Sequence, residues 1–166
     1  MNLLILGAGG FATEVEELAR TLGYDNICFL DDYPDKARCK PVIGRMDDCS
    51  LFMGKFQHAI VAIGNNQLRS LWHNKIMDLG FNIPSLVSLN AYVSPDAKLF
   101  PGCIVRQFCV VGRKAVIGQA TILNINSKVD HDCVIGDYSH LLIGAVVRNS
   151  VVLPSFSWLD SNAVKQ

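Results

Sequence analysis

The sequence has no excess of charge of either sign and no long apolar run. Its 166 residues include 15 Lys plus Arg and 15 Asp plus Glu, which gives a formal net charge of zero. This balance gives no support for a nucleic-acid-binding protein, which carries a basic surface, or for an acidic solvating tail. No stretch approaches the ~20 apolar residues that a membrane-spanning helix needs. Half of the residues are apolar, so the chain can form a globular core.

Closely spaced cysteine pairs are also absent, although the chain has six cysteines. Structural zinc sites and redox-active disulfides usually contain a CxxC motif. The first residues, MNLLILGAGG, lack the basic segment of a signal peptide, and glycines interrupt their apolar run. We therefore expect free thiols in a reducing compartment, a cytoplasmic protein and no metal site.

The first 88 residues alternate between buried apolar segments and amphipathic ones. Strand, helix, strand in this order is typical of a parallel sheet with right-handed crossovers. The last apolar segment, FNIPSLV at 81–87, predicts one more short strand. We expect an α/β, Rossmann-like domain over residues 1–88, with strands within 2–10, 26–32 and 58–65 and helices at 12–23 and 66–80.

Each predicted helix has apolar residues spaced three and four apart, as expected for one buried face. A glycine, Gly23 or Gly80, ends each helix. The buried faces are predicted to contain Val15, Leu18, Ala19 and Leu22 in the first helix, and Leu68, Leu71, Trp72, Ile76 and Leu79 in the second.

From Val93 onward, every sixth residue is Val, Ile or Leu, and this continues through Leu159. The residue four positions after each of these is small or β-branched, and three of the six cysteines (Cys103, Cys109 and Cys133) occupy such positions. Hexapeptide repeats of this kind are the signature of a parallel β-helix, in which the aliphatic residue points inward. Glycine follows the aliphatic residue at 112, 118 and 136, where we expect it to permit turn geometry. We expect a β-helix domain over residues 89–166.

A glycine turn, GAGGFA at 7–12, follows the first predicted strand and opens the first predicted helix. This pattern fits G-x-G-x-x-G/A, in which backbone N–H groups and a helix N-terminus hold phosphate. Asp31 and Asp32 end the second strand, where an acid often contacts a ribose hydroxyl. About 88 residues is half of a full dinucleotide fold, so a nucleotide-sugar fits better than NAD. The alternative is a turn that serves tight packing only.

The segments ILGAGGFA, FLDD, AIGNN, ILN and VDHDCVIGDYSH together resemble the left-handed β-helix acyltransferases. The closest resemblance is to bacterial sugar acetyltransferases that modify nucleotide-linked amino sugars or sialic acid. It extends over nearly the whole chain and implies a left-handed β-helix, a homotrimer and acetyl-CoA as co-substrate.

Acetyl transfer from a thioester to an amine needs a base, a donor to the oxyanion and close positioning of both substrates. Histidine suits the role of base, and an adjacent acid can orient its ring. Asp130 and Asp132 flank His131 in the DHD motif. By resemblance, His131 is the base and Asp132 its acidic partner, His140 contacts the acetyl end of the cofactor, and Gly144 also binds the cofactor.

Other readings of these histidines stay open. His131 and His140 lie outside the inward positions, so they can face a groove between subunits or be solvated turn residues. A metal site of His131, Asp132, Cys133 and His140 is disfavoured because Cys133 occupies a small inward position. His58 and His73 are isolated and read as structural or surface residues.

The resemblance also implies a substrate site, made by Gly9, Gly10, Phe11, Asp31, Asp32, Gly64 and Asn124. The related amino-sugar enzymes often have histidine and glycine in place of Phe11 and Ala12, so the nucleotide stays open. The predicted function is N-acetylation of a nucleotide-linked amino sugar in bacterial surface-glycan synthesis. The alternatives are O-acetylation of a sialic-acid-like sugar, and a non-catalytic nucleotide-sugar binder, because the family usually has one more coil before its VLP segment.

Overall fold

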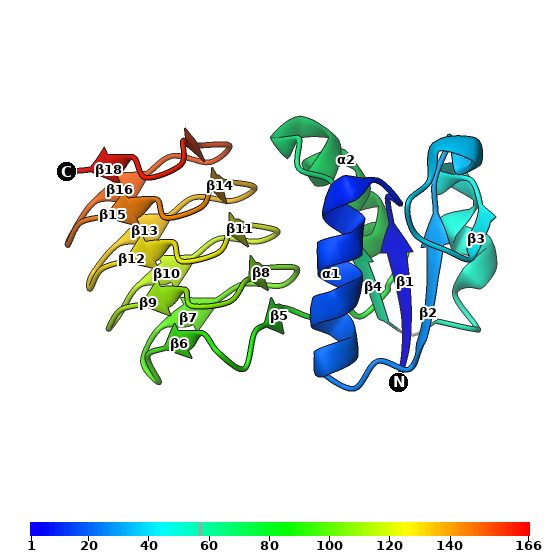
Figure 1. Ribbon diagram of the computed structural model, residues 1–166, viewed down its shortest axis with the longest axis horizontal. Helices are drawn as coiled ribbons and strands as arrows, with labels where there is room; N and C mark the ends of the chain where they lie inside the picture. Colours follow the sequence, from blue (N-terminus) through cyan, green and yellow to red (C-terminus); the bar gives the residue numbers. More distant parts are fainter. Residues whose placement is uncertain (57) are drawn as a thin grey trace. The chain divides into compact units, whose positions relative to one another are not determined.

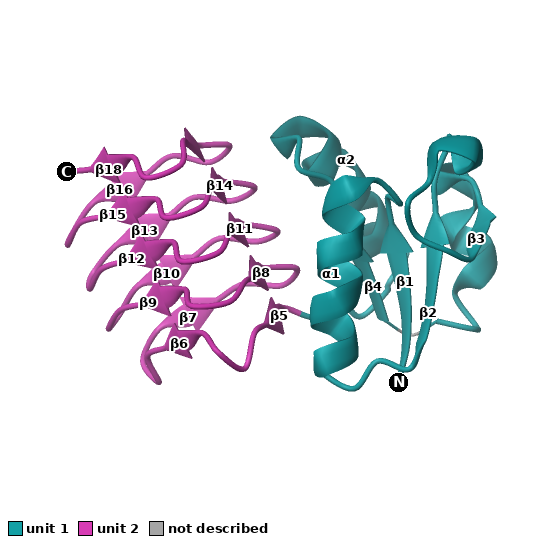
Figure 2. Cartoon of the chain, viewed as in Figure 1, with its two compact units in different colours: residues 1–84 teal, residues 85–166 magenta. Residues whose placement is uncertain are grey.

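The computed structural model describes residues 1–56 and 58–166, which form two compact units (Figure 2). The first unit is Met1–Pro84 and the second is Ser85–Gln166, whereas the sequence prediction placed the boundary after residue 88. Within the described residues, no helix has both the length and the apolar character to cross a membrane.

The first unit contains a four-stranded parallel sheet in the order β3-β2-β1-β4 (Figure 1). Its central strand β1 is apolar throughout after Asn2, and its last four residues are fully buried. Parallel strands buried in this way read as continuous apolar runs, which is why the sequence revealed them. The elements are β1 (Asn2–Leu6), α1 (Gly10–Thr21), β2 (Asn26–Leu30), η1 (Pro34–Lys36), β3 (Val42–Gly44), η2 (Met46–Phe52), β4 (His58–Val61) and α2 (Asn66–Asp78).

The prediction of a last strand at 81–87 in this sheet was wrong. Asn82 forms only an isolated bridge with His58. Leu86–Val87 is β5, which pairs with β8 (Ile104–Val105) in the second unit. The fourth strand of the sheet is β3, which has three residues and is too short to show a periodic pattern.

The buried face of α2 also differs from the prediction. Leu68 and Leu71 are 50% and 59% exposed, whereas Arg69 and His73 are buried beside Ile76. The Arg69 guanidinium donates to the carbonyls of Ile63 and Gly64, each at 2.9 Å, and to the Asn66 side chain at 2.8 Å. A buried charge needs such acceptors, and here they come from the loop that precedes the helix and from the first residue of the helix.

The second unit is a parallel β-helix whose coils each add one two-residue strand to each of three sheets (Figure 1). Partners in neighbouring coils lie 18 residues apart, as Leu86 and Ile104 do. The remaining strands are β6 (Tyr92–Val93), β7 (Lys98–Leu99), β9 (Val110–Val111), β10 (Val116–Ile117), β11 (Ile122–Leu123), β12 (Lys128–Val129), β13 (Val134–Ile135), β14 (His140–Leu141), β15 (Val146–Val147), β16 (Val152–Leu153), β17 (Trp158–Leu159) and β18 (Val164–Lys165).

The second residue of each strand from β6 to β17 points into the β-helix, as the six-residue repeat predicts. Every aliphatic residue of the repeat belongs to one core cluster, and most are fully buried. Burial of each such side chain contributes roughly 1.5–3 kcal/mol. Cys103, Cys109 and Cys133 lie in the same cluster, so they serve as small core residues.

The glycines that follow the inward residues do not have the role that the sequence suggested. The left-handed conformation recurs at every sixth residue from Gly102 to Asn162, with φ between 48° and 79°. Gly112, Gly118 and Gly136 precede these positions by two residues and lie outside that region. A Cβ on Gly112 would be 2.7 Å from the His131 backbone nitrogen, so this glycine allows close approach of the next coil.

Candidate functional site

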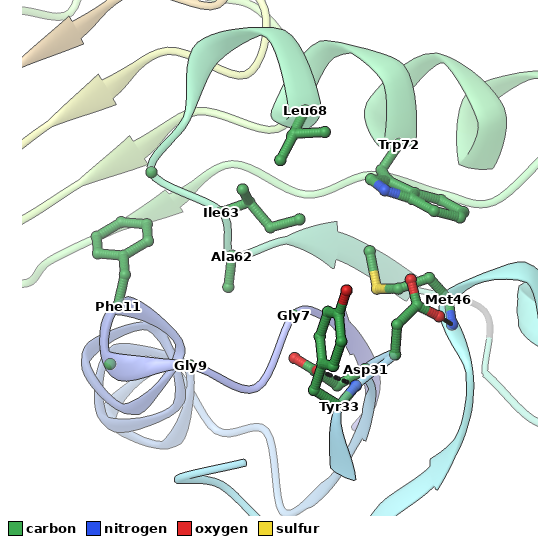
Figure 3. A pocket seen from close by; sticks show the side chains of 13 residues that line it. Gly7, Gly9, Phe11, Asp31, Tyr33, Met46, Ala62, Ile63, Leu68 and Trp72 are labelled. Carbon is green, nitrogen blue, oxygen red and sulfur yellow. Dashed lines mark hydrogen bonds between the residues drawn. The ribbon is translucent and has the colours of Figure 1, made fainter. Parts of the chain in front are cut away.

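A cavity of about 500 Å³ lies at the carboxyl ends of the strands of the first unit (Figure 3). Ligands of open parallel sheets bind at this edge. Aromatic and apolar side chains from separate segments surround the cavity, with the glycine turn at its base. The lining residues are Gly7, Gly9, Gly10, Phe11, Asp31, Asp32, Tyr33, Met46, Ala62, Ile63, Gly64, Leu68 and Trp72.

All six predicted substrate residues of the first unit line this cavity: Gly9, Gly10, Phe11, Asp31, Asp32 and Gly64. The sequence reasoning missed the contribution of Tyr33, Met46, Ile63, Leu68 and Trp72. Leu68 and Trp72 were expected on a buried helix face. The sequence thus identified them as apolar contact residues but did not predict that they line a cavity. Tyr33 and Met46 carry no periodic signal, because they lie outside the strands and the longer helices.

The two acids after β2 are occupied by hydrogen bonds to the backbone. Asp31 accepts from the N–H of Ala8 through one oxygen and from that of Tyr33 through the other, each at 2.8 Å. Asp32 accepts from the N–H of Met46 at 3.2 Å. Asp31 therefore fixes the glycine turn against the end of β2, in addition to lining the cavity.

Helix α1 begins directly after Gly9, which makes no side-chain cap, and its first turn contains no acid. The first backbone N–H groups of such a helix lack acceptors within the helix and favour an anion. Gly9 and Gly10 are exposed, and a Cβ on Gly9 would meet nothing within 4 Å. The turn is therefore open to a ligand, and Phe11 places a ring beside it (Figure 3).

His131 lies at an exposed corner of the β-helix between β12 and β13. The Asp130 carboxylate accepts from the His131 backbone N–H at 2.7 Å, and Asp132 contacts the His131 Nδ1 atom at 2.7 Å. The side chains of His131 and Asp132 are 52% and 50% exposed. Because a carboxylate only accepts, Nδ1 carries the proton in this pair, and the lone pair of Nε2 is the one that can take a proton.

A cavity of about 440 Å³ opens beside this corner and is lined by residues of three successive coils. Below it, the Ser94 hydroxyl donates to Asp96 at 2.6 Å, and this bond, together with Lys114 N–H and Arg113, holds the pKa of Asp96 below its usual range. Arg113 Nε lies 3.3 Å from Asp96. The cavity lining consists of Tyr92, Gly112, Arg113, Lys114, Asp130, His131 and Asp132.

His140 lies elsewhere in the β-helix. It is the outward residue of β14, is 6% exposed, and packs edge-on against Trp158 with ring centroids 4.7 Å apart. The cavity beside His131 does not include it, so one chain does not gather the two histidines in one cavity. The Cys133 thiol points to the Arg148 carbonyl at 3.0 Å, inside the coil. Among residues 1–56 and 58–166, no cluster of three His, Cys, Asp or Glu could hold a metal ion.

Asn124 and Gly144 share a corner of the β-helix, between the sheets of β11 and β12. Gly144 has a φ of 70° and donates its N–H to the Ile125 carbonyl at 2.9 Å. Asn124 Oδ1 accepts from Arg106 Nη1 at 2.7 Å and from Ile125 N–H at 2.8 Å. The structure thus brings together one cofactor-binding and one substrate-binding candidate, at a corner different from that of His131.

Comparison with known proteins places this arrangement in a family. Residues 2–76 match the model of the PglD N-terminal domain. The chain is 28% identical to GDP-perosamine N-acetyltransferase of Escherichia coli O157:H7, over 99% of this chain and 78% of that protein.

Two solved structures share the complete fold. The acetyltransferase domain of PglB from Neisseria gonorrhoeae is 30% identical, with a TM-score of 0.81 over 99% of this chain and 91% of that one. A mutant of GDP-perosamine N-acetyltransferase from Caulobacter crescentus, in complex with CoA and GDP-perosamine, is 25% identical, with a TM-score of 0.87 over 100% and 89%. The predicted α/β unit followed by a left-handed β-helix is thereby confirmed, and the chain belongs to the hexapeptide-repeat sugar acetyltransferases.

Proposed function

We propose that this enzyme transfers the acetyl group of acetyl-CoA to the amine of a nucleotide-linked amino sugar in bacterial surface-glycan synthesis. Two relatives are named for N-acetylation of GDP-perosamine, and the PglB domain has been solved with acetyl coenzyme A. These names favour an amine acceptor over a hydroxyl. The observation that carries the proposal is the His131–Asp132 pair at 2.7 Å on an exposed β-helix corner beside a cavity.

The nucleotide binds in the cavity of the first unit. Gly9 and Gly10 offer backbone N–H groups to a phosphate, because they precede and begin α1. The aromatic and apolar lining suits a base, and Asp32 and Gly64 complete the polar edge. Phe11 stands where related enzymes often have a histidine, and its ring offers the phosphate no hydrogen-bond donor.

In the proposed reaction, His131 takes one proton from the amine and later gives it up. The sugar amine attacks the thioester carbonyl carbon while Nε2 of His131 takes an amine proton, forming the new C–N bond. The tetrahedral intermediate then collapses with cleavage of the C–S bond, and the imidazolium returns the proton to the departing CoA thiolate. Asp132 holds the ring and stabilises the imidazolium. The products are the N-acetyl sugar and CoA.

His140 and Gly144 contribute to the acetyl-CoA site. Trp158 fixes the His140 ring through their edge-on contact, which suits a residue that must present one nitrogen to a thioester oxygen. Because His131 and His140 occupy different places on one chain, we propose that both substrates meet between subunits of a homotrimer. The outward residues Tyr92, Val110, Val134 and Val152, which are 37–67% exposed, support such an assembly. Light scattering should give three times the chain mass.

We place the reaction in the cytoplasm. All six cysteines are free, and three of them are core residues of the β-helix that could not form disulfides without disrupting it.

The test is a turnover assay with purified protein, acetyl-CoA, and GDP-perosamine within a panel of nucleotide-linked amino sugars. Mass spectrometry of the sugar product avoids a thiol readout, which six cysteines would disturb. We expect a product heavier by one acetyl group from at least one amine. Binding of nucleotide sugar without any acetylated product would instead identify a non-catalytic binder, and acetylation of a hydroxyl would identify an O-acetyltransferase.

A further inference from the structure

Arg106 is a charged side chain with only 7% exposure at a corner of the β-helix. It follows β8 and so occupies, one coil earlier, the place that Asn124 occupies after β11. Its backbone N–H donates to the Leu123 carbonyl at 2.9 Å, and its Nη1 donates to Asn124 Oδ1 at 2.7 Å. Burial of a guanidinium is costly unless acceptors surround it. One of its acceptors here is Asn124, which the family resemblance assigns to the substrate site.

The neighbours of Asn124 determine which end of its amide faces a ligand. Oδ1 accepts from the Arg106 guanidinium at 2.7 Å and from the backbone N–H of Ile125 at 2.8 Å. Both neighbours are donors only, so a flipped amide would place its NH₂ group against two other N–H groups. The oxygen has two lone pairs, and both are used. The two N–H bonds of Nδ2 are therefore the part of Asn124 that can contact a substrate.

We propose that Asn124 contacts the substrate as a hydrogen-bond donor and that Arg106 is the positioning residue that fixes this polarity. This inference rests on the proposed acetyl transfer to a nucleotide-linked amino sugar. The contact is then made to an oxygen of the sugar, such as a hydroxyl or the ring oxygen. It is not made to the amine, since the amine N–H bonds need an acceptor and its lone pair must stay available to attack the thioester.

Asn124→Asp separates a donor role from an acceptor role. The carboxylate keeps both bonds at Oδ1, from Arg106 and Ile125, replaces the N–H groups by an oxygen that only accepts, and adds a negative charge. With GDP-perosamine, or whichever panel sugar the wild type acetylates fastest, we expect the KM for the sugar to rise about tenfold or more, because a donor is replaced by an acceptor. The KM for acetyl-CoA should stay unchanged, and the melting temperature should not fall, because the added charge faces the Arg106 guanidinium.

Asn126→Asp is the matched control, because it makes the same change of charge at an exposed residue two positions away. It should leave both KM values within twofold of the wild type. If the wild type turns over and Asn124→Asp retains its sugar KM, the donor assignment is wrong. If the wild type acetylates no amino sugar, the proposed function itself is wrong. The wild-type assay therefore distinguishes a wrong function from a wrong donor assignment.

The positioning role of Arg106 is tested by Arg106→Lys and Arg106→Met. Lysine keeps a charged donor that can reach Asn124, whereas methionine keeps only the apolar part of the side chain. We expect Arg106→Met to raise the sugar KM several-fold with little change in kcat, and Arg106→Lys to restore most of it. Equal sugar KM values in the wild type and a folded Arg106→Met variant would overturn the role of Arg106. If Arg106→Met fails to fold, Arg106→Gln, which is shorter and uncharged, takes its place. An unchanged sugar KM in folded Arg106→Gln would overturn the role of Arg106, and a raised one would support it.

Discussion

Two acidic side chains, Asp31 in the first unit and Asp132 in the β-helix, have different kinds of partner. In the first unit, Asp31 gives both oxygens to backbone N–H groups and so holds the loop that forms the ligand cavity. In the β-helix, Asp130 accepts from the backbone N–H of His131, and the next acid, Asp132, contacts the His131 ring. A carboxylate whose two oxygens both accept backbone N–H groups fixes the shape of a loop. A carboxylate that contacts a histidine ring can instead take part in catalysis. The first acid should therefore matter to folding and binding, and the second to rate.

The largest expected effect is a loss of kcat when His131, the partner of Asp132, is replaced. His131→Ala should lower kcat at least a hundredfold, because it removes the proposed base, while the melting temperature changes little. The measurement is product formation by mass spectrometry, alongside differential scanning calorimetry. A variant with normal turnover would exclude His131 as the base.

A second experiment asks whether the repeat backbone itself positions His131. In Gly112→Ala, the new Cβ would lie 2.7 Å from His131 N and 2.8 Å from Asp130 C, so the corner must shift. We expect a loss of about 1–3 kcal/mol in the free energy of unfolding and a lower kcat. Gly54→Ala is the control, since its Cβ would meet nothing within 4 Å. Equal behaviour of the two variants would show that coil spacing can relax.

The third experiment compares the two acids directly. Asp31→Asn replaces an acceptor of two backbone N–H groups by a side chain with one acceptor oxygen, so it should cost about 1–3 kcal/mol of stability and weaken nucleotide-sugar binding. Asp132→Asn should leave stability nearly unchanged and lower kcat about tenfold or more. Chemical denaturation measures the stability, calorimetric titration measures the binding of the nucleotide sugar, and the turnover assay measures kcat. A reversal of the two patterns would contradict the division of roles.

The smallest effect concerns the buried thiols. Burial raises the pKa of Cys103 in the β-helix to about 12 and that of Cys39 in the first unit to about 11, from 9.0. A raised folded-state pKa stabilises the fold below the unfolded value and loses that contribution as pH rises. Each thiol should therefore lower the free energy of unfolding as the pH rises from 9 towards its folded pKa, and should have no effect on the pH dependence of that free energy at neutral pH. Cys103→Ala should flatten this slope in pH-dependent denaturation; an unchanged slope would exclude Cys103 as its source.

The sequence predicted the β-helix more completely than the first unit. A six-residue repeat gives equivalent residues the same environment in every coil. The sequence alone therefore predicted that Leu141 and Cys133 point into the core. The first unit has no such redundancy. The sequence identified Gly9 and Asp31 through a local motif, but the strand β3 and the cavity residue Tyr33 depend on which segments fold together.

The polar contacts of the candidate site were the least predictable part. The burial of Arg69 reverses the expected face of α2, because loop carbonyls outweigh the apolar pattern of Leu68 and Leu71. The pair of Arg106 and Asn124 joins residues 18 positions apart, one coil from the next. The repeat predicts that such residues are neighbours, but it does not predict which of them hydrogen-bond.

Because neighbouring coils are 18 residues apart, the length of the second unit could be changed in defined steps by protein engineering. Inserting one complete coil of 18 residues would lengthen the β-helix by one strand spacing, about 4.8 Å, and leave every side chain at its original sheet or corner. Inserting six residues would keep the inward and outward pattern intact yet move everything downstream to the next edge. A chain altered in that second way would fold with a normal core and present its histidine to a different neighbour.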